Sequence, residues 1–580
     1  MNNTQTLTGK ASIDKPWLKY YPAELIDNLQ IPVCTMNQYM QYNMPGLDVP
    51  AIHYYGTDIT WAEMFSNIEK IARSLKAMGV KEGDQIPSFL RSVPEFIMLF
   101  LAAEKVGASV LCRMNTLKEN VEAVASAGSR FIFAHDFITV DEMNMFLSES
   151  SVEKIILLSP CNSCNRNNMP DYIQKSLYAN YVDVPASGKA TMTWHEFLAL
   201  GETYTGEVEA PFNPDRPLFR CYTSGSTGPS KQVIHSAHSL IGVLGQMNFY
   251  GNQEGIRPTW MVTILPPTLV AVVTSMMLLP LASNKLLIQN PWVTVDDLDL
   301  ELMRVKPNNW PLIPMFIESL LLSKRIPADY DLSHLITAGA GAEACNNTLL
   351  RSFRKFLSDH NCHVPFTTGY GSSEAGSNLT FHVSGRPVGD YNVGCPMPLT
   401  TVAIFKPGTT EELGYDEFGE ICVNGPGVML GYNLPENTAK ALIKHPDGKV
   451  WLHMGDIGAM DKDGHIRNAG RGSNKRFGGG FLDLLIMENL VGDAQIPGVR
   501  DQFFVNVPDQ EHEGYLLPYL YVVLEEGYTI EDIRSAALSV LEPHMYPVEI
   551  RQVPRRPYWQ FKTNRFGLAQ EILNMKDSRI

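Results

Sequence analysis

The chain has 580 residues, of which 44% are apolar and 19% charged, and its net charge is −15 at pH 7. This length exceeds what a single hydrophobic core organises, so we expect two or more folded domains. The acidic balance argues against a protein that binds nucleic-acid backbones, because such proteins present clustered lysine and arginine side chains.

The N-terminal part of the chain alternates between strand-like and helix-like patterns. Residues 51–56 and 57–61 predict a β-hairpin, and Thr60 with Glu63 three residues later predicts the start of a helix over 61–78. Short apolar strands then alternate with longer amphipathic helices, which is typical of a parallel sheet in an α/β protein. The expected strands are 85–90, 108–112, 131–134 and 154–158, and the expected helices are 94–106, 117–126 and 140–148.

Nine cysteines are scattered along the chain and predict no disulfide framework, which fits a reducing compartment. The N-terminus shows no secretory signal, so we expect a cytoplasmic protein. Cys161 and Cys164 have the spacing of metal ligands but no second pair nearby, and the crowded His360, Cys362 and His363 are too irregular for a zinc site. We therefore predict no metal site at either cluster.

A cluster of hydroxylated residues and glycines follows a predicted strand over Pro217–Tyr222 and ends in a lysine. Glycines let backbone N–H groups face an anion, hydroxyls add donors, and a lysine adds a positive charge. The pattern predicts a phosphate-binding loop, and the alternative is an ordinary surface loop, in which such residues are also common. The residues are Thr223, Ser224, Gly225, Ser226, Thr227, Gly228 and Lys231.

This loop resembles the signature loop of the acyl-adenylate-forming enzymes, which include acyl-CoA synthetases, beetle luciferase and peptide-synthetase adenylation domains. The family pattern is Tyr-Thr-Ser-Gly-(Ser/Thr)-Thr-Gly-x-Pro-Lys-Gly, from which the chain departs at Ser230 and Gln232. The resemblance extends over about residues 50–580 and is greatest to stand-alone acyl-CoA ligases. It implies a large N-terminal domain over 1–472, made of layered α/β subdomains and a small β subdomain. A small mobile α+β lid over 473–580 would follow.

Residues 261–283 form a run of 23 residues without a charge, long enough on length alone to span a membrane. Pro266, Pro267 and Pro280 interrupt the run and would break a membrane helix. We therefore predict no transmembrane segment here. The expected structure is a strand ending at Leu265 and a buried helix near 269–279.

Two further segments follow predicted strands over 335–338 and 364–367. The second resembles the family's Tyr-Gly-x-Thr-Glu block, which implies that Tyr370 lies against adenine, Ser373 faces the α-phosphate and Glu374 holds Mg²⁺. A carboxylate with substrate phosphates is the usual way to bind this cation, although an isolated glutamate at a helix start can also interact with the helix dipole. The nucleotide residues implied here are Gly339, Ala340, Gly341, Tyr370, Gly371, Ser372 and Ser373.

Short β runs between glycine and proline turns over 388–432 predict the small β subdomain. A third block, over 451–471, resembles the family segment whose aspartate and arginine reach the ribose. The resemblance assigns these roles to Asp456 and Arg471, and the carboxylate acceptor and fork-shaped donor suit ribose hydroxyls. Met454 stands where the family has threonine. The alternative is a plain Gly-Asp turn.

The last block, over 553–565, resembles the family's C-terminal lysine motif. By this resemblance Lys562 bridges carboxylate and phosphate oxygens during adenylation, although Phe561 replaces the usual glycine. A basic, aromatic surface is the alternative. Ser473 would be the hinge of the lid, and Gly480 would lie at the thiol entrance.

The resemblance implies that ATP, with Mg²⁺, activates a carboxylic acid to acyl-AMP, and that a thiol then displaces AMP. Lys562, Lys231 and Glu374 would carry the catalysis. The segment 265–272 matches the one in which peptide-synthetase domains use an aspartate to bind an amino-acid ammonium, and it lacks an acidic residue, so a free α-amino acid is not expected. The apolar Val272, Val273, Met276 and Met277 are consistent with a hydrophobic acid, and the alternative is that they belong to the core. Coenzyme A is the expected acceptor and an acyl carrier protein the alternative. A catalytically impaired nucleotide- or acyl-binding protein is the alternative from another class.

Overall fold

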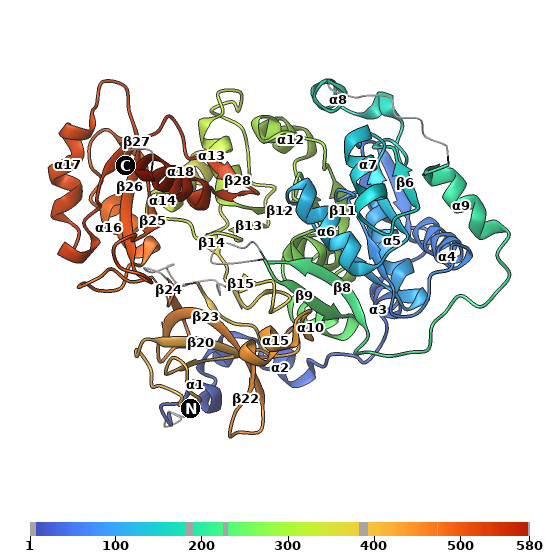
Figure 1. Ribbon diagram of the computed structural model, residues 1–580, viewed down its shortest axis with the longest axis horizontal. Coiled ribbons are helices and arrows are strands. Elements are labelled where there is room, and N and C mark those ends of the chain that lie inside the picture. The colour runs from blue at the N-terminus through green and yellow to red at the C-terminus, as the bar shows by residue number, and fades with distance from the viewer. Residues whose placement is uncertain (1–6, 180–188, 224–229, 382–392, 473, 578–580) are drawn as a thin grey trace.

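The computed structural model describes residues 7–179, 189–223, 230–381, 393–472 and 474–577 (Figure 1). It has the mixed α/β architecture expected from the sequence. The largest sheet contains seven strands, of which six are parallel and the edge strand β2 is antiparallel. In spatial order the strands are β14 (Phe366–Thr368), β13 (Thr337–Ala340), β12 (Asn309–Leu312), β10 (Thr259–Val262), β11 (Leu286–Gln289), β1 (Pro50–Tyr54) and β2 (Thr57–Thr60).

A second sheet of five strands carries the predicted phosphate-binding segment. Strands β3, β4 and β8 are parallel, and β9 and β21 continue the sheet in antiparallel pairing. In order these are β21 (Gly431–Tyr432), β9 (Gln232–Ser236), β8 (Pro217–Tyr222), β4 (Ser109–Leu111) and β3 (Gln85–Pro87). A bridge from Ser88 to Phe133 links this sheet to a third, parallel one, β5 (Phe131–His135), β6 (Lys154–Leu158) and β7 (Thr191–Thr193).

The helices between these strands follow the sequence signals closely. Helix α4 begins after Thr60, whose side chain accepts from the Glu63 N–H while Glu63 caps the Thr60 N–H, as predicted. Helix α5 is apolar on nearly all sides and almost wholly buried, which places it at the centre of the core. The helices of this part are α3 (Met36–Asn43), α4 (Trp61–Ala77), α5 (Pro94–Val106), α6 (Leu117–Ala127), α7 (Val140–Glu149), α8 (Asp171–Tyr178), α9 (Trp194–Glu202), α10 (Ala237–Met247), α12 (Leu298–Val305), α13 (Pro314–Leu322) and α14 (Asn347–Asp359).

The uncharged run 261–283 is buried core, but its details differ from the prediction. Strand β10 ends at Val262, and a π-helix, η3 (Val272–Leu278), leads into the short helix α11 (Leu279–Ala282). Two features disfavour a regular α-helix here: Pro280 lacks an N–H, and the Thr274 hydroxyl bonds the carbonyl of Val270. Among the described residues, no helix is both long enough and apolar enough to cross a membrane.

The predicted β subdomain is an antiparallel sheet at the lower left of Figure 1. Its strand β23 is long and bulges opposite the Glu420–Cys422 stretch of β20. A bulge re-aims side chains, and this one lies beside Asp456, a predicted ribose ligand. The strands are β19 (Thr401–Phe405), β20 (Gly419–Asn424), β23 (Val450–Met460), β22 (Leu442–Lys444) and β24 (Ile466–Arg471).

Residues after 474 form a small α+β unit with its own apolar clusters, one between α16, α17 and the sheet and one under α18. This unit lies next to α14 (Figure 1). Separate cores support the predicted lid, although its boundary stays a prediction because residue 473 lies outside the described residues. The elements are β25 (Val499–Pro508), β26 (Leu516–Leu524), β27 (Ile550–Gln552), β28 (Tyr558–Trp559), β29 (Lys562–Thr563), α16 (Leu484–Asp493), α17 (Ile530–Ser539) and α18 (Arg565–Asp577).

Candidate functional site

The predicted phosphate-binding loop connects the antiparallel strands β8 and β9. Its two ends are joined, because the Thr223 N–H donates to the Lys231 carbonyl at 2.9 Å and the Lys231 N–H donates to Thr223 Oγ1 at 3.0 Å. Ser230 Oγ also donates to the Thr223 carbonyl, at 2.5 Å. Ser224, Gly225, Ser226, Thr227 and Gly228 lie outside the described residues, so their role stays a prediction.

The structure accounts for Gln232, which stands where the family has glycine. Its buried side chain accepts from Arg220 at 3.2 Å and donates to the Tyr222 hydroxyl at 3.1 Å. The Arg113 guanidinium lies over the Tyr222 ring, 4.3 Å from its centroid. These contacts fix the strand that enters the loop.

The 370–374 block and the 451–471 block, which is predicted to bind ribose, meet at Asp456. The Tyr370 hydroxyl donates to Asp456 Oδ2 at 2.5 Å, and Arg471 Nε lies 3.2 Å from Oδ1. Burial raises the pKa of Asp456, while the Arg471 cation and the Tyr370 hydrogen bond act in the opposite direction. Burial and the nearby Asp456 charge also raise the pKa of Tyr370, so this phenol remains a hydrogen-bond donor.

Glu374 and Lys231 meet at a residue that the sequence did not single out, Tyr432 of β21. The Tyr432 hydroxyl donates to Glu374 Oε1 at 2.7 Å, and Lys231 Nζ lies over the Tyr432 ring, 5.1 Å from its centroid. The Met429 N–H also donates to the Glu374 carbonyl at 2.8 Å. The proposed metal carboxylate and the proposed phosphate lysine therefore share one aromatic neighbour.

Arg471 and Met454 lie in contact with each other beside Asp456. Arg471 donates from Nη1 to the Met454 carbonyl at 2.8 Å, and Ser372 Oγ lies 3.8 Å from Met454 Sδ. Gly455 between Met454 and Asp456 has φ of +71°, a left-handed conformation that glycine adopts without strain. The departure from threonine at Met454 thus leaves the Asp456–Arg471 pair intact.

The two segments predicted to contact adenine also lie side by side. Gly339 and Ala340 belong to β13, which runs two residues further than predicted, and the Gly369 N–H donates to the Ala340 carbonyl at 3.1 Å. This places Gly339, Ala340 and Gly341 beside the strand that leads to Tyr370. Gly371 pairs with Asn378, and a Cβ on Gly371 would lie 1.9 Å from the Ser377 carbonyl oxygen, so the close approach requires glycine.

A second residue that the sequence did not single out, His235 of β9, contacts the backbone of the 370–374 block. Its Nε2 lies 2.7 Å from the Ser373 carbonyl oxygen and its Nδ1 lies 3.2 Å from Ser239 Oγ. Burial lowers its pKa to about 4, against the raising effect of the Ser373 hydrogen bond and the Glu374 charge. A buried neutral histidine that donates to Ser373 therefore fixes the turn before Glu374. Nothing local in the sequence marks this contact, because 138 residues separate its partners.

Lys562 belongs to the C-terminal unit and lies close enough to Glu374 and Arg471 to interact with their charges. Strands β28 and β29 form a hairpin whose two loop residues, Gln560 and Phe561, have φ of +48° and +68°. Two-residue hairpin loops favour positive φ, which explains why the family has glycine where this chain has Phe561. Burial lowers the pKa of Lys562, with Glu343 and Glu374 acting to raise it and Arg471 to lower it further. Lys562 thus lies within electrostatic range of Glu374 and Arg471, the predicted metal and ribose residues.

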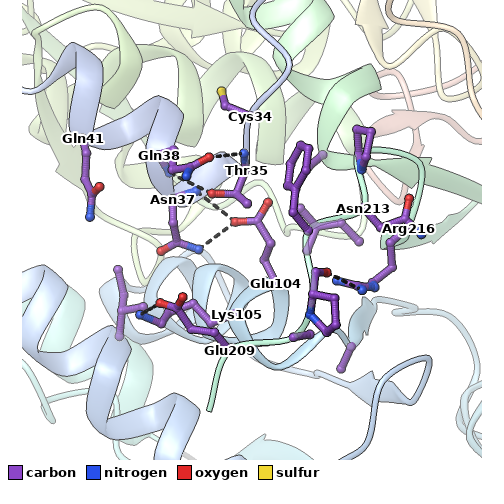
Figure 2. Close-up of a pocket in the computed structure, with 18 of the residues that line it drawn as sticks. Cys34, Thr35, Asn37, Gln38, Gln41, Glu104, Lys105, Glu209, Asn213 and Arg216 are labelled. Atoms are coloured by element: carbon purple, nitrogen blue, oxygen red, sulfur yellow. Dashed lines mark hydrogen bonds and ion pairs between the residues drawn. The ribbon is translucent and has the colours of Figure 1, made fainter. Parts of the chain in front are cut away.

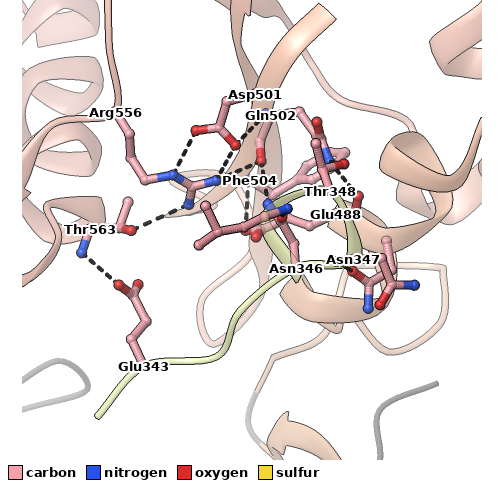
Figure 3. Close-up of polar contacts among 12 residues, drawn as sticks. Glu343, Asn346, Asn347, Thr348, Glu488, Asp501, Gln502, Phe504, Arg556 and Thr563 are labelled. Atoms are coloured by element: carbon pink, nitrogen blue, oxygen red, sulfur yellow. Dashed lines mark hydrogen bonds and ion pairs between the residues drawn. The ribbon is translucent and has the colours of Figure 1, made fainter. Parts of the chain in front are cut away.

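A polar network holds this hairpin in place (Figure 3). The Thr563 N–H donates to Glu343 Oε2 at 3.1 Å, and Arg565 Nη1 pairs with Glu343 Oε1 at 2.5 Å. Arg565 also pairs with Glu488 at 2.8 Å, and Arg556 forms a two-pronged pair with Asp501. Burial raises the pKa of Glu343, but the Arg565 and Arg556 charges outweigh it and hold that pKa below its usual range.

The hinge and thiol residues are not tested by this arrangement. Ser473 lies outside the described residues. Gly480 lies in a turn closed by the Arg476 N–H, and a Cβ there would lie 2.8 Å from His544 Nε2. In this conformation Gly480 therefore contacts its own C-terminal unit. Their roles stay predictions.

Residues 41–433 match the family model described as AMP-binding enzyme, which covers more than half of the chain. The chain belongs to the AMP-binding enzyme family.

Relatives of this AMP-binding enzyme include two CoA ligases. A 4-coumarate–CoA ligase 3 of Oryza sativa subsp. japonica is 26% identical over 477 residues, or 78% of this chain and 77% of the relative. A long-chain-fatty-acid–CoA ligase of Bacillus subtilis is 26% identical over 558 residues, or 92% of this chain and 93% of the relative.

Solved structures show the same fold. ATP-bound MatB from Rhodopseudomonas palustris has a TM-score of 0.74 and 20% identity, with 93% of this chain and 99% of that chain covered. The anthranilate CoA ligase AuaEII in complex with anthranoyl-AMP has a TM-score of 0.76 and 16% identity, with 95% and 99% covered. At these identities the likeness concerns the fold alone.

The AMP-binding enzyme also has a cavity of about 350 Å³ away from these residues, between α3, α4, α5 and segment 209–217 (Figure 2). Glu104 of α5 faces it and accepts from the Met36 and Asn37 N–H groups at 2.5 and 2.9 Å. These bonds satisfy donors of the first turn of α3, beside the Thr35 cap. The Glu104 carboxylate therefore anchors the N-terminal segment, and the predicted site residues do not line this cavity.

Proposed function

We propose that this protein uses ATP to convert a carboxylic acid to acyl-AMP and then transfers the acyl group to coenzyme A. The observation that carries the proposal is the meeting of Tyr370, Glu374, Asp456, Arg471 and Lys562 at one corner of the fold. These residues come from three separate sequence blocks and two structural units. The names of the relatives, which are CoA ligases, support the same reaction class.

In this proposal, Asp456 accepts from the ribose hydroxyls and Arg471 keeps that carboxylate oriented and ionised. Tyr370 packs against the adenine beside Gly339 and Gly341. Lys231 and Lys562 neutralise negative charge as the acid oxygen attacks the α-phosphate and pyrophosphate leaves. Catalysis then consists mainly of alignment and charge stabilisation, as is usual for reactions at phosphorus.

The residues present fit a magnesium ion at Glu374. The Glu374 carboxylate is half-buried, and its Oε1 accepts a hydrogen bond from the Tyr432 hydroxyl. Among the described residues, no group donates a hydrogen bond to its Oε2. A hard cation with octahedral preference takes one or two carboxylates and substrate phosphates. When bound, Mg²⁺ neutralises phosphate charge. Tyr432 positions the carboxylate that would hold it.

We infer that the acid is hydrophobic. The segment that follows β10 contributes the buried side chains Leu265, Val272, Val273 and Met277. The π-helix η3 is tied to the nucleotide block, because Thr274 Oγ1 donates to the Gly376 carbonyl at 3.0 Å and Ser275 Oγ lies 2.6 Å from Ser377 Oγ. A free amino acid is disfavoured, since segment 265–272 offers no acidic side chain to its ammonium group.

Acid-dependent exchange of labelled pyrophosphate into ATP tests the first half-reaction. We expect exchange with one or more members of a broad panel of fatty and aromatic acids. An absence of exchange across the whole panel, with ATP binding retained, would favour a nucleotide-binding protein without catalysis.

The acceptor requires a second assay. With an exchanging acid in hand, acyl transfer to free coenzyme A is compared with transfer to the pantetheine of an isolated carrier protein. We expect coenzyme A to be acylated faster. Faster loading of the carrier would replace this part of the proposal and leave the adenylation step standing.

A further inference from the structure

The small β sheet contains a cluster of metal-ligating side chains that the proposed reaction does not use. Cys422 of β20 is directly opposite His453 of β23, and Glu420 lies two residues before Cys422 on the same strand. One ligand atom from each of Glu420, Cys422 and His453 lies within 4.8 Å of the other two. The side chains come from β20 and β23, which are separated in the sequence, so no local motif predicts this cluster.

The cluster is well shielded from solvent. The side chains of His453 and Glu420 are 6% and 14% exposed, and Cys422 is fully buried. The Phe405 ring packs edge-on against His445 with centroids 4.6 Å apart, and Trp451 lies 5.1 Å from Phe405. Such surroundings strengthen electrostatic interactions within the cluster.

Hydrogen bonds already orient the imidazole of His453. Its Nδ1 lies 2.9 Å from Glu420 Oε2, and its Nε2 lies 2.9 Å from Nε2 of His445. His445 is itself buried, and among the described residues its Nδ1 has no hydrogen-bond partner. Histidines that ligate metals are usually held by such a contact on the opposite ring nitrogen.

We propose that Glu420, Cys422 and His453 bind a zinc-class divalent cation, with His445 positioning the His453 ring. A thiolate, an imidazole and a carboxylate are the ligand types that zinc accepts, and three protein ligands leave the fourth position to water. Zinc bond lengths place neighbouring ligand atoms about 3.3–3.8 Å apart in a tetrahedron, so small side-chain rotations close the site.

Charge balance favours this occupant. On binding, the Cys422 thiol releases its proton to solvent, so that one thiolate and one carboxylate neutralise a divalent cation. The assembled site then has no net charge, which lowers the cost of keeping it buried. An ordinary Glu420–His453 ion pair is the competing interpretation, and it gives Cys422 no role.

The position of the site suggests an effect on the nucleotide. Glu420 Oε1 accepts from the Gly455 N–H at 3.1 Å, and Gly455 precedes Asp456, the proposed ribose ligand. A cation bound at Glu420 would withdraw negative charge from the vicinity of Asp456. This consequence rests on the proposed function, whereas the metal site itself does not.

The test is direct metal binding by the full chain. The protein is loaded with Zn²⁺, freed of excess over a chelating resin and analysed by elemental mass spectrometry. We expect about one zinc ion per chain, at least roughly 100-fold weaker binding in Cys422→Ser and His453→Gln, and roughly 10- to 100-fold weaker binding in His445→Gln. Cys362→Ser, which changes a buried cysteine near His360 and His363, should bind as the unmodified chain does.

Co²⁺ provides a spectroscopic signature that folding defects do not mimic. We expect a sulfur-to-cobalt charge-transfer band that Cys422→Ser abolishes and Cys362→Ser retains, with circular dichroism confirming that both variants are folded. Equal zinc content in Cys422→Ser and the unmodified chain, or no thiolate band in the unmodified chain, overturns the proposal. Pyrophosphate exchange is measured separately, so failure of either proposal leaves the other testable.

Discussion

Asp456 illustrates how single side chains define the proposed nucleotide corner. Its two oxygens are taken by groups of different chemistry, the Tyr370 hydroxyl at 2.5 Å and the Arg471 guanidinium at 3.2 Å. Either partner alone would leave part of a buried carboxylate without a hydrogen bond, which is costly. The pairing therefore joins two blocks that lie far apart in the sequence, 370–374 and 451–471.

Lys562 is the residue on which the adenylation step depends most. We expect Lys562→Ala to slow pyrophosphate exchange by at least about 100-fold, because a charge that stabilises the transition state is lost. ATP affinity should change by less than about threefold, since Asp456, Arg471 and Tyr370 remain. Lys355→Ala, which alters an exposed lysine paired with Asp359, is the matched control. Unchanged exchange in Lys562→Ala would remove this lysine from the mechanism.

Gly371 is a position where the backbone leaves no room for a side chain. The Cβ of Gly371→Ala would lie 1.9 Å from the Ser377 carbonyl oxygen, so the turn before Glu374 must shift. We expect a loss of roughly 1–3 kcal/mol in the free energy of unfolding, as is common for overpacking.

The control for this change is Gly341→Ala, because a Cβ there meets nothing within 4 Å. Thermal unfolding by calorimetry compares the two variants with the unmodified chain. Equal melting temperatures for both variants would show that the Gly371 turn tolerates a side chain.

At the scale of elements, the contacts of Glu343 tie the Lys562 hairpin to the large N-terminal part. This carboxylate accepts from the Thr563 N–H and pairs with Arg565, which precede and open α18. We propose that the C-terminal unit rotates between the two half-reactions, so these bonds must break before the thiol step. Glu343 would then stabilise the adenylating arrangement.

We expect Glu343→Gln to slow pyrophosphate exchange by about tenfold, because losing a charge-assisted hydrogen bond costs roughly 1.5–3 kcal/mol in part of the ensemble. Transfer from preformed acyl-AMP to coenzyme A should be unchanged or faster. Glu531→Gln is the control, since its pair with Arg534 is exposed and such pairs contribute little. Slower thiol transfer with unchanged exchange would contradict the assignment.

Helices whose ends are marked by capping residues, proline or glycine were predictable from the sequence. The capping pair Thr60 and Glu63 located α4, and α5 was predicted with its observed bounds, 94–106. The π-helix was not predictable, because the Thr274 hydroxyl that bonds the Val270 carbonyl also bonds the carbonyl of Gly376, 102 residues away. Local patterns indicate where the chain turns, but not which hydrogen-bond ladder a buried apolar segment adopts.

In the candidate site too, residues within local motifs could be predicted from the sequence, and residues brought together only by the fold could not. Compact motifs predict Tyr370, Glu374, Asp456 and Arg471, and the structure places Tyr370 and Arg471 in contact with Asp456, while their binding roles stay predictions. Tyr432, His235 and Glu343 were missed, because their roles arise only when strands far apart in sequence become neighbours. Phosphate-loop residues 224–228 and Ser473 lie outside the described residues and remain predictions.

For the whole molecule, buried histidines predict a loss of stability in acid. Burial lowers the pKa of His135 to about 3, with Arg91 adding to the effect and the Leu158 hydrogen bond opposing it. Between pH 6.5 and 3 the unfolded chain therefore binds more protons at this residue than the folded chain does. Unfolding becomes easier as pH falls through that window.

We expect His135→Gln to lose about 2 kcal/mol less stability than the unmodified chain between pH 7 and pH 5. Calorimetry at both pH values measures this difference. His195→Gln, which changes an exposed histidine, is expected to retain the pH dependence of the unmodified chain. Equal pH dependence in His135→Gln would show that this imidazole protonates in the folded protein without cost.

Phe561, which precedes Lys562 and has a left-handed backbone conformation, has a consequence for the rate of the proposed reaction. Phe561 packs against the main apolar core, and its neighbour Gln560 reaches across to Asn115 Oδ1 at 2.7 Å. The Phe561 ring is partly buried, so returning it to water costs less than the roughly 1.5–3 kcal/mol of a fully buried side chain, a cost that glycine would not have. We therefore propose that this contact slows the withdrawal of the hairpin after adenylation, and with it the thiol-transfer half-reaction.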